Sequence, residues 1–381
     1  MMDEQTITNA KVVLGEEIVH GSVSIIDSKI SDLSQGNSLT ADTVDFGGDY
    51  LLPGFVELHT DNLEKHFAPR PGVDWPGIPA ALAHDAQLAA GGITTVYDAV
   101  CLGDLFKTSN RVRQLDQMSD AISHAQTLNI FRAEHHIHLR CELSFEGVLD
   151  LFDEHADHPL VGLVSLMDHT PGQRQFVNLD KYHEYYQKKY GMTEDELDEF
   201  AKRQVAAHDT FCDEHRSAVV ERSKARGLPL ASHDDATIAH VEEAVSLGAV
   251  IAEFPTTLEA ARASHERGLS VLMGAPNLVL GGSHSGNVSA GSLAAEGLLD
   301  IISSDYVPTS MLQGVFVLAG DDVDVGLPQA VQKAAANPAQ AANLNDRGEI
   351  AIGKRADLLR VSYSDEIPFV RSVWRKGMRV A

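Results

Sequence analysis

The stretch LLPGFVELHTD, residues 51–61, opens the part of the chain that decides the fold. It is a strand-like run that ends in polar residues, and seven further runs of this kind follow. Most are separated by helix-like segments such as residues 79–92 and 109–129. Eight strands that alternate with helices predict an α/β fold, a (β/α)8 barrel of the TIM type. The further runs are TTVYDAV (94–100), IFRAEHHIHLRCEL (130–143), LVGLVSLMDH (160–169), LPLASHDD (228–235), AVIAEFP (249–255), SVLMGAP (270–276) and DIISSDYVP (300–308).

Both ends of the chain are rich in short strand patterns, unlike the middle. The first 50 residues alternate β-branched residues with turn signals, and residues 348–364 and 369–380 do likewise. We therefore expect the ends to pair into one small domain, a β-sandwich of residues 1–50 and 343–381 beside a barrel of residues 51–342. The alternative is that these segments are merely peripheral strands.

One predicted connection, about residues 176–226, is too long for a simple loop and helix. It reads as an inserted helical hairpin, in which TEDE (193–196) begins the second helix as a capping box. We expect it over the mouth of the barrel, as a lid or a dimer surface. An ordinary elaboration of the helix layer is the alternative. A barrel with such an insertion favours a homodimer.

Composition excludes several classes of protein. With 381 residues, 44% hydrophobic and 22% charged, the chain is globular rather than disordered. A net charge of −25 argues against nucleic acid or an anionic membrane as partner. No apolar run approaches the ~18 residues of a membrane helix, and the acidic start is unlike a signal peptide. Three cysteines form no disulfide framework, so we expect a cytoplasmic protein.

Barrel enzymes carry their catalytic groups at the carboxyl ends of the strands. In the first run Glu57, His59 and Asp61 share one face, because residues two apart in a strand point the same way. An imidazole and a carboxylate on one face are suitable ligands for a divalent metal.

The third run alternates ionisable and apolar residues. Glu134, His136, His138, Arg140 and Glu142 share the face that we expect inside the barrel. Ionisable groups there need a metal, a charged substrate or one another. A structural chain of ion pairs is the alternative for the deeper residues. Glu142, nearest the carboxyl end, is the best ligand candidate.

Three later runs also end in candidate ligands or catalytic groups. His169 ends the fourth run, and His233 lies near the end of the fifth. Asp305 lies near the end of the eighth, where it could act as general base toward a water activated by the metal. The predicted metal and catalytic set is His59, Asp61, Glu142, His169, His233 and Asp305.

Basic and hydroxyl-bearing residues predict a site for an anionic substrate. Lys65 and Arg70 follow the first strand, Arg174 follows the fourth, and the loop after the seventh is rich in glycine and serine. Such loops bind phosphate through N–H groups, although a merely flexible loop is the alternative. The predicted substrate-binding residues are Lys65, Arg70, Arg140, Arg174, Ser283, His284 and Asn287.

With these residues in place, the chain resembles the amidohydrolase superfamily. LLPGFVELHTD, AAGGITTVYD (89–98) and GEIAIGKRADLL (348–359) carry the likeness over nearly the whole chain. Longer motifs resemble the phosphonate-metabolism branch of the superfamily. They are HTDNLEKHFAPRPGVDW (59–75), HHIHLRCE (135–142), SLMDHTPGQRQ (165–175), ASHDDAT (231–237), GAPNLVLGGSHSGNVSA (274–290) and SSDYVP (303–308).

This resemblance implies hydrolysis of a ribose 5-triphosphate that bears a 1-methylphosphonate, with release of pyrophosphate. It implies one or two divalent metals, zinc first, with manganese, iron or nickel as alternatives. His59 and Asp61 would hold the metal, with Glu142, His169 and His233 as further candidates. The first strand has H-x-D where the superfamily usually has H-x-H, and neither a bridging lysine nor a histidine on the sixth strand is present. A carboxylate must then bridge if two metals bind.

The sequence alone leaves two other functions open. An amidohydrolase that acts on a C–N bond would use the same metal and Asp305, with a less basic pocket. A non-catalytic scaffold on a decayed barrel would bind no metal.

Overall fold

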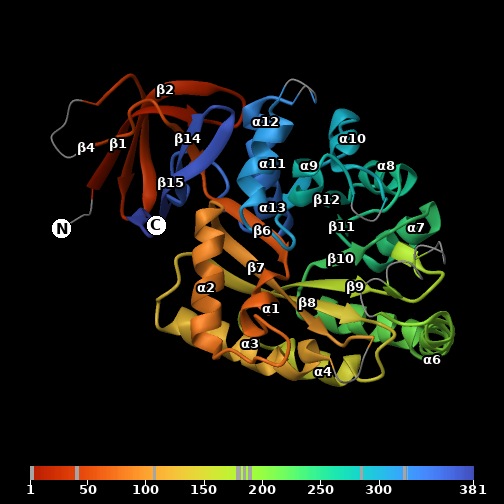
Figure 1. The fold of residues 1–381 in the computed structure, drawn as a ribbon. Helices are drawn as coiled ribbons and strands as arrows, with labels where there is room; N and C mark the ends of the chain where they lie inside the picture. Colours follow the sequence, from red (N-terminus) through yellow and green to blue (C-terminus); the bar gives the residue numbers. More distant parts are fainter. Residues whose placement is uncertain are drawn as a thin grey trace.

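The computed structural model describes residues 4–38, 43–105, 109–176, 182, 186–187, 191–283, 286–320, 323 and 325–381. Figure 1 shows a sheet built from both chain ends beside a larger unit of strands surrounded by helices. No described helix is both long enough and apolar enough to cross a membrane.

The larger unit is the predicted barrel. Its eight strands pair in the order in which they occur in the chain, and all the pairs are parallel. A parallel bridge between Thr60 and Asp305 joins the first strand to the end of the last. The (β/α)8 prediction is therefore confirmed. The strands are β6 (Phe55–Thr60), β7 (Ile93–Leu102), β8 (Glu134–Glu142), β9 (Val161–Met167), β10 (Leu230–His233), β11 (Ile251–Glu253), β12 (Ser270–Gly274) and β13 (Ile301–Ser303).

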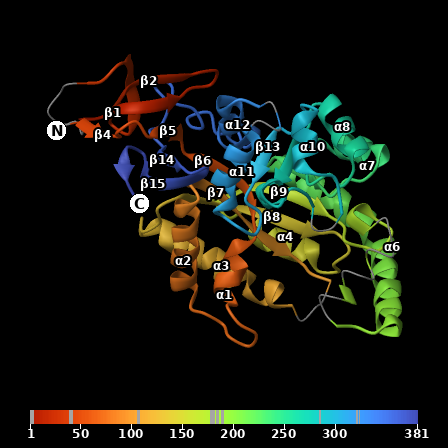
Figure 2. The same ribbon diagram turned by 45° about the horizontal axis from the view of Figure 1, so that its top comes forward.

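Helices cover the outside of the barrel (Figures 1 and 2). The predicted helix at 79–92 is found at 77–90, and Gly92, with φ +85°, makes the turn into β7. The helix-like run 328–344 is divided in two at Ala335. The helices are α1 (Asn62–Phe67), α2 (Gly77–Ala90), α3 (Asn110–Thr127), α4 (Val148–His155), α6 (Glu194–Ala225), α7 (Ile238–Leu247), α8 (Leu258–Glu266), α9 (Ala275–Val279), α10 (Ala290–Ala295), α11 (Ser310–Leu318), α12 (Leu327–Ala334) and α13 (Ala336–Ala341).

The two chain ends pair into one small β domain, as predicted, and its strands form a single sheet. Its strands follow the order β16-β15-β14-β5-β1-β2-β3, with β4 also paired to β1, so segments from both ends are hydrogen-bonded at β5 and β14. Its core includes Phe46 and Trp374, whose ring centroids lie 5.5 Å apart. The strands are β1 (Glu4–Val13), β2 (Ile18–Ile26), β3 (Lys29–Gln35), β4 (Thr43–Asp45), β5 (Tyr50–Pro53), β14 (Leu358–Ser364), β15 (Ile367–Arg375) and β16 (Met378–Arg379).

The long connection contains the 32-residue helix α6. Its capping box is present: the Thr193 hydroxyl accepts a hydrogen bond from the Glu196 N–H, and the Glu196 carboxylate accepts one from the Thr193 N–H. The first helix of the predicted hairpin falls largely on residues 177–181, 183–185 and 188–190, outside the described residues. A single 3-10 turn, Arg174–Phe176, precedes them.

The alternation of the third barrel strand is confirmed. Ile137, Leu139 and Cys141 pack in one cluster with residues of α3 and α4. A second cluster joins apolar residues from seven barrel strands, including Leu163, Ile251 and Ile301. With the apolar face of β8 turned toward the helices, its polar face is left for the barrel interior.

Candidate active site

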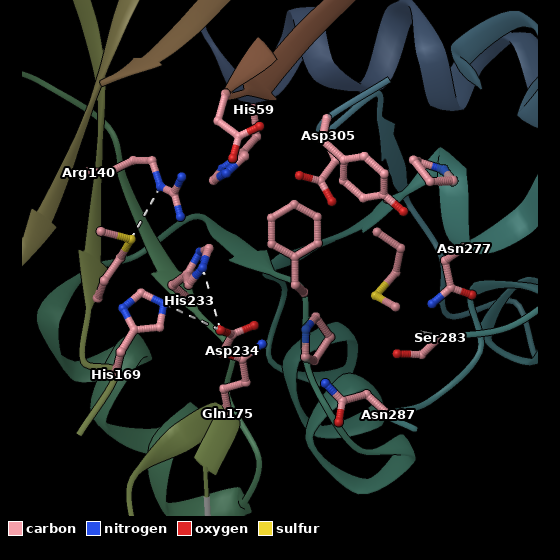
Figure 3. A pocket seen from close by; sticks show the side chains of 18 of the residues that line it. His59, Arg140, His169, Gln175, His233, Asp234, Asn277, Ser283, Asn287 and Asp305 are labelled. Atoms are coloured by element: carbon pink, nitrogen blue, oxygen red, sulfur yellow. Dashed lines mark hydrogen bonds and ion pairs between the residues drawn. The ribbon is translucent and has the colours of Figure 1, made fainter. Parts of the chain in front are cut away.

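A cavity of about 300 Å³ opens among the segments that follow the barrel strands. All six residues of the predicted metal and catalytic set line it, and each comes from the carboxyl end of a strand or the residues just after it. Figure 3 shows His59, His169, His233 and Asp305 converging on this space. Five strands therefore bring their terminal polar groups into one pocket.

Two of the histidines are held by one buried glutamate that the sequence reasoning missed. Glu253 is the last residue of β11. Its Oε1 lies 3.0 Å from His59 Nδ1, and its Oε2 lies 3.1 Å from His233 Nδ1. A carboxylate that accepts from Nδ1–H leaves Nε2 as the ligand atom. The prediction looked for a histidine on this strand, and the glutamate in AEFP was the available signal.

The imidazole rings of His59 and His233 are neutral, which is the form that binds a metal. Burial holds the pKa of His59 well below its usual value and lowers the pKa of His233 to about 3. The rings stack with centroids 5.5 Å apart. Neutral imidazoles are metal ligands, whereas protonated ones are not.

His169 forms a second group with two carboxylates. Its Nδ1 lies 2.5 Å from Glu142 Oε2, and the Ser144 hydroxyl donates to Glu142 Oε1 over 2.9 Å. Asp234 Oδ2 lies 3.5 Å from His233 Nε2 and 4.0 Å from His169 Nε2, between the two rings (Figure 3). Asp234 follows His233 directly in ASHDDAT, and the prediction did not select it. His169, His233 and Asp234 each offer one ligand atom within 4.8 Å of the others.

Two further carboxyl groups, those of Asp61 and Asp305, line the pocket. Burial and the nearby charge of Asp61 raise the pKa of Asp305 to about 8. The backbone of Asp305 is fixed, since the Thr60 hydroxyl donates to its carbonyl oxygen over 2.6 Å. Glu57 lies deeper, outside the pocket lining, and accepts from the Ser303 hydroxyl and the Ser304 N–H. Neighbouring carboxylates of like charge favour a bound cation or a shared proton.

Arginine side chains supply the positive charge of the pocket. Arg140 is buried, its Nε donates to Met167 Sδ over 3.3 Å, and no carboxylate of the described residues lies within 4.0 Å of its guanidinium group. Arg111, which the prediction missed, also lines the pocket from the first turn of α3. Its Nε donates to Glu64 Oε2 over 2.8 Å, and its Nη2 lies 3.7 Å from Asp61 Oδ2.

The other predicted substrate-binding residues divide into two groups. Ser283 and Asn287 line the pocket. Lys65, Arg70 and Arg174 do not belong to its lining, and His284 lies outside the described residues. Lys65 Nζ donates to the Tyr306 carbonyl oxygen over 2.5 Å at the rim.

Arg70 and Arg174 have different surroundings from those expected for phosphate ligands. Arg70 is exposed, and its backbone forms a bridge with Val73 in its own loop. Arg174 is buried and pairs with Asp235 and, over 2.7 Å, with Glu243. Two carboxylates already pair with this guanidinium group. They tie the loop of Arg174 to Asp235, which follows β10, and to Glu243 of α7.

Comparison with known proteins agrees with this architecture. The model of the Amidohydrolase family matches residues 178–380. The chain is 50% identical over 375 residues to the alpha-D-ribose 1-methylphosphonate 5-triphosphate diphosphatase of Escherichia coli (strain K12), covering 98% of this chain and 99% of that protein.

Solved structures share the fold at low sequence identity. The N-acetylglucosamine-6-phosphate deacetylase of Pasteurella multocida has a TM-score of 0.61 at 11% identity, covering 99% of this chain and 100% of its own. An adenosine deaminase of Xanthomonas campestris with bound zinc has a TM-score of 0.61 at 17% identity, covering 98% and 92%. By its sequence match, its barrel and the polar groups at the strand ends, the chain belongs to the amidohydrolase family, which is generally metal-dependent.

Proposed function

We propose that the chain hydrolyses α-D-ribose 1-methylphosphonate 5-triphosphate to α-D-ribose 1-methylphosphonate 5-phosphate and pyrophosphate, a step of phosphonate catabolism. The observation that carries this proposal is the 50% identity to the named diphosphatase along 98% of the chain. The chain is accordingly a hydrolase that acts on an acid anhydride. The buried guanidinium group of Arg140 lines the pocket and has no ion-pair partner among the described residues, which supports an anionic substrate.

The donor set of the pocket fits a divalent metal. His59, Asp61, Glu142, His169 and His233 supply imidazole and carboxylate ligands, and zinc, manganese, iron or nickel accepts such ligands. We assign one or two ions to this set, with zinc first. The buried Nε2 of His138, which has no hydrogen-bond partner in the described structure, fits a ligand or metal nearby. When bound, the metal supplies Lewis acidity, which polarises phosphoryl oxygens and makes water more acidic.

Asp305 is the proposed general base. In the reaction, the oxygen of water bonds to phosphorus, the P–O bond to the leaving pyrophosphate breaks, and the proton of the water passes to the Asp305 carboxylate. A cation held by Asp61 counteracts the like-charge repulsion that raises the Asp305 pKa. Arg140 offsets the charge on the phosphoryl oxygens.

The test is pyrophosphate release by the purified protein from this triphosphate, with bound metal quantified in the same sample. We expect release that chelation abolishes and metal restores. His59→Ala should lose bound metal and release together. Bound metal without release would overturn the proposal in favour of C–N bond hydrolysis, and a protein with neither metal nor turnover after reconstitution would be a scaffold. A homodimer, a cytoplasmic location and the exclusion of nucleic acid and membrane partners stay predictions.

A further inference from the structure

The pocket has two chemically different ends. Arg140 and His169 lie on one side in Figure 3, and Asn277, Ser283 and Asn287 lie on the opposite side. Among the described lining residues, Arg111 and Arg140 are the lysine or arginine side chains. The side formed by Asn277, Ser283 and Asn287, hereafter the amide wall, carries no formal charge. A substrate with unequal charge at its two ends therefore meets an asymmetric pocket.

Arg140 is the stronger of the two anion-binding groups. Its side chain is buried, and its sulfur contact with Met167 uses only Nε, so the terminal Nη groups face the pocket without an ion-pair partner among the described residues. A buried unpaired charge is costly, and a bound anion removes that cost. Two parallel N–H groups match the oxygens of a phosphate.

Arg111 lies on the same side. Arg111 and Arg140 both lie near Glu64 and Asp61, whose negative charges act on both guanidinium groups, and they lie near each other. The contact of Arg111 with Glu64 engages Nε and fixes the side chain, while its Nη2 stands 3.7 Å from Asp61. A guanidinium held by one carboxylate at Nε keeps N–H groups for a second anion.

The amide wall suits a less charged group. The side-chain Oδ1 of Asn277 accepts from the Ala290 N–H over 3.0 Å, which fixes this loop against α10. Asn287 presents an amide group, which pairs with sugar hydroxyls as donor or acceptor. A triphosphate carries several negative charges at neutral pH, and the methylphosphonate ester at the other end of the ribose carries fewer.

We infer that Arg111 and Arg140 bind the two terminal phosphates, which leave as pyrophosphate, while the amide wall receives the ribose 1-methylphosphonate part. This orientation rests on the proposed function and goes beyond it, because it assigns each end of the substrate to one side of the pocket. Arg111 then becomes a binding residue for the leaving group.

Product inhibition separates the two sides. The inhibition constants of pyrophosphate and of ribose 1-methylphosphonate 5-phosphate are measured on the metal-loaded enzyme and on Arg111→Gln and Asn287→Ala. We expect Arg111→Gln to weaken pyrophosphate about tenfold and to change the other constant less than twofold. We expect Asn287→Ala to weaken the sugar phosphate selectively, by about threefold to tenfold. Arg113→Gln is the matched control, since Arg113 lies on the same helix and pairs with Asp74 outside the pocket.

Two precautions make the outcome decisive. Because Arg111→Gln leaves Glu64 without its partner, Glu64→Gln/Arg111→Gln is measured beside it and should show the same selective loss. Pyrophosphate release by the wild-type enzyme is scored separately and tests the proposed function. With release intact, equal weakening of both products by Arg111→Gln, unchanged pyrophosphate inhibition, or pyrophosphate weakened by Asn287→Ala would overturn the orientation.

Discussion

Asp305 is positioned by its backbone, which frees its carboxyl group for chemistry. Its φ of +51° lies in the left-handed region, where a non-glycine residue is uncommon. The Thr60 hydroxyl holds its carbonyl oxygen, and its N–H donates to the Ser303 hydroxyl over 3.2 Å. Strained backbone of this kind is often found at functional sites, where the surrounding structure determines it.

We therefore expect Asp305→Asn to remove turnover without removing the metal. The amide keeps the size of the side chain and cannot accept the proton, so kcat should fall about 10²–10⁴-fold. Pyrophosphate release and metal content are measured on the same preparation. Asp300→Asn, at the other end of β13 and outside the pocket lining, should keep its activity. Loss of metal from Asp305→Asn would instead identify Asp305 as a required ligand.

We expect Arg174 to be a structural residue rather than the substrate-binding residue that the sequence predicted. Because it is buried between Asp235 and Glu243, Arg174→Ala should lower the free energy of unfolding by about 2–4 kcal/mol. The expected change of KM for the triphosphate is less than the change that Arg140→Ala produces. Chemical denaturation and steady-state kinetics measure the two quantities. A raised KM with unchanged stability would return Arg174 to its predicted role in substrate binding.

At the scale of the element, β7, β8 and α2 share a buried polar cluster outside the barrel. Asp98 on β7 accepts from His84 Nε2 at 2.7 Å and from His135 Nδ1 at 2.6 Å, and His135 Nε2 lies 3.4 Å from Asp85. Although burial alone would lower the pKa of His135, the two carboxylates raise it to about 9. His135 on β8 is therefore charged at neutral pH and links β7 to α2.

This link predicts a specific pH dependence of stability. Because the folded pKa of His135 is above its unfolded value of roughly 6.5, the protonated form stabilises the fold fully below pH 6.5, and this contribution is lost toward pH 9. His135→Gln should lower the free energy of unfolding by about 1–3 kcal/mol near pH 6.5, and the difference from wild type should shrink as the pH rises to 9. Denaturation at several pH values measures it, with the exposed His124→Gln as control. A difference independent of pH would contradict a charged His135.

The alternation of polar and apolar residues along β8 explains which site residues could be predicted from the sequence. The alternation in residues 134–142 placed Arg140 and Glu142 inside the barrel because a strand has a period of two. The same pattern gave no information on what lies across the barrel, so Glu253 and Arg111 were missed. Arg111 comes from a helix, and its approach to the pocket depends on the packing of α1 and α3 and on its pair with Glu64. Arg174 looked like a phosphate ligand because sequence cannot show that Asp235 and Glu243 surround it.

At the scale of the whole molecule, the barrel and the end sheet meet in a continuous interface. Gly54 alone separates β5 of the sheet from β6 of the barrel, and a Cβ at this position would clash with the Thr94 side chain. The Gly54 N–H donates to the Asp357 carbonyl oxygen over 2.8 Å. On another part of this interface, the Phe316 ring of α11 stacks on the Tyr363 ring of β14 with centroids 5.0 Å apart. The sheet therefore supports the barrel from which the site is built.

Glu134, at the start of β8, is the charged centre of this interface. Its Oε1 accepts from Arg347 over 3.1 Å, its Oε2 accepts from Arg355 over 2.6 Å, and Lys376 Nζ lies 3.5 Å away. Burial raises the pKa of Glu134, but its contact with His136 and the charges of Arg355 and Arg347 hold it well below its usual value. Both arginines are buried, so this carboxylate supplies part of the negative charge that they need.

Glu134→Gln should therefore lower the stability of the interface and leave kcat unchanged. Removing the charge weakens two buried arginine contacts, although Asp346 and Asp357 still pair with them, so the free energy of unfolding should fall by about 1–3 kcal/mol. Since the folded pKa is depressed, the difference from wild type should be full above about pH 5 and disappear as the pH falls through the folded pKa. Glu349→Gln, which breaks the more exposed pair with Lys354, should cost less than about 1 kcal/mol. Denaturation and pyrophosphate release are measured together, and a loss of kcat in Glu134→Gln at full stability would show instead that the deep carboxylates of β8 take part in catalysis.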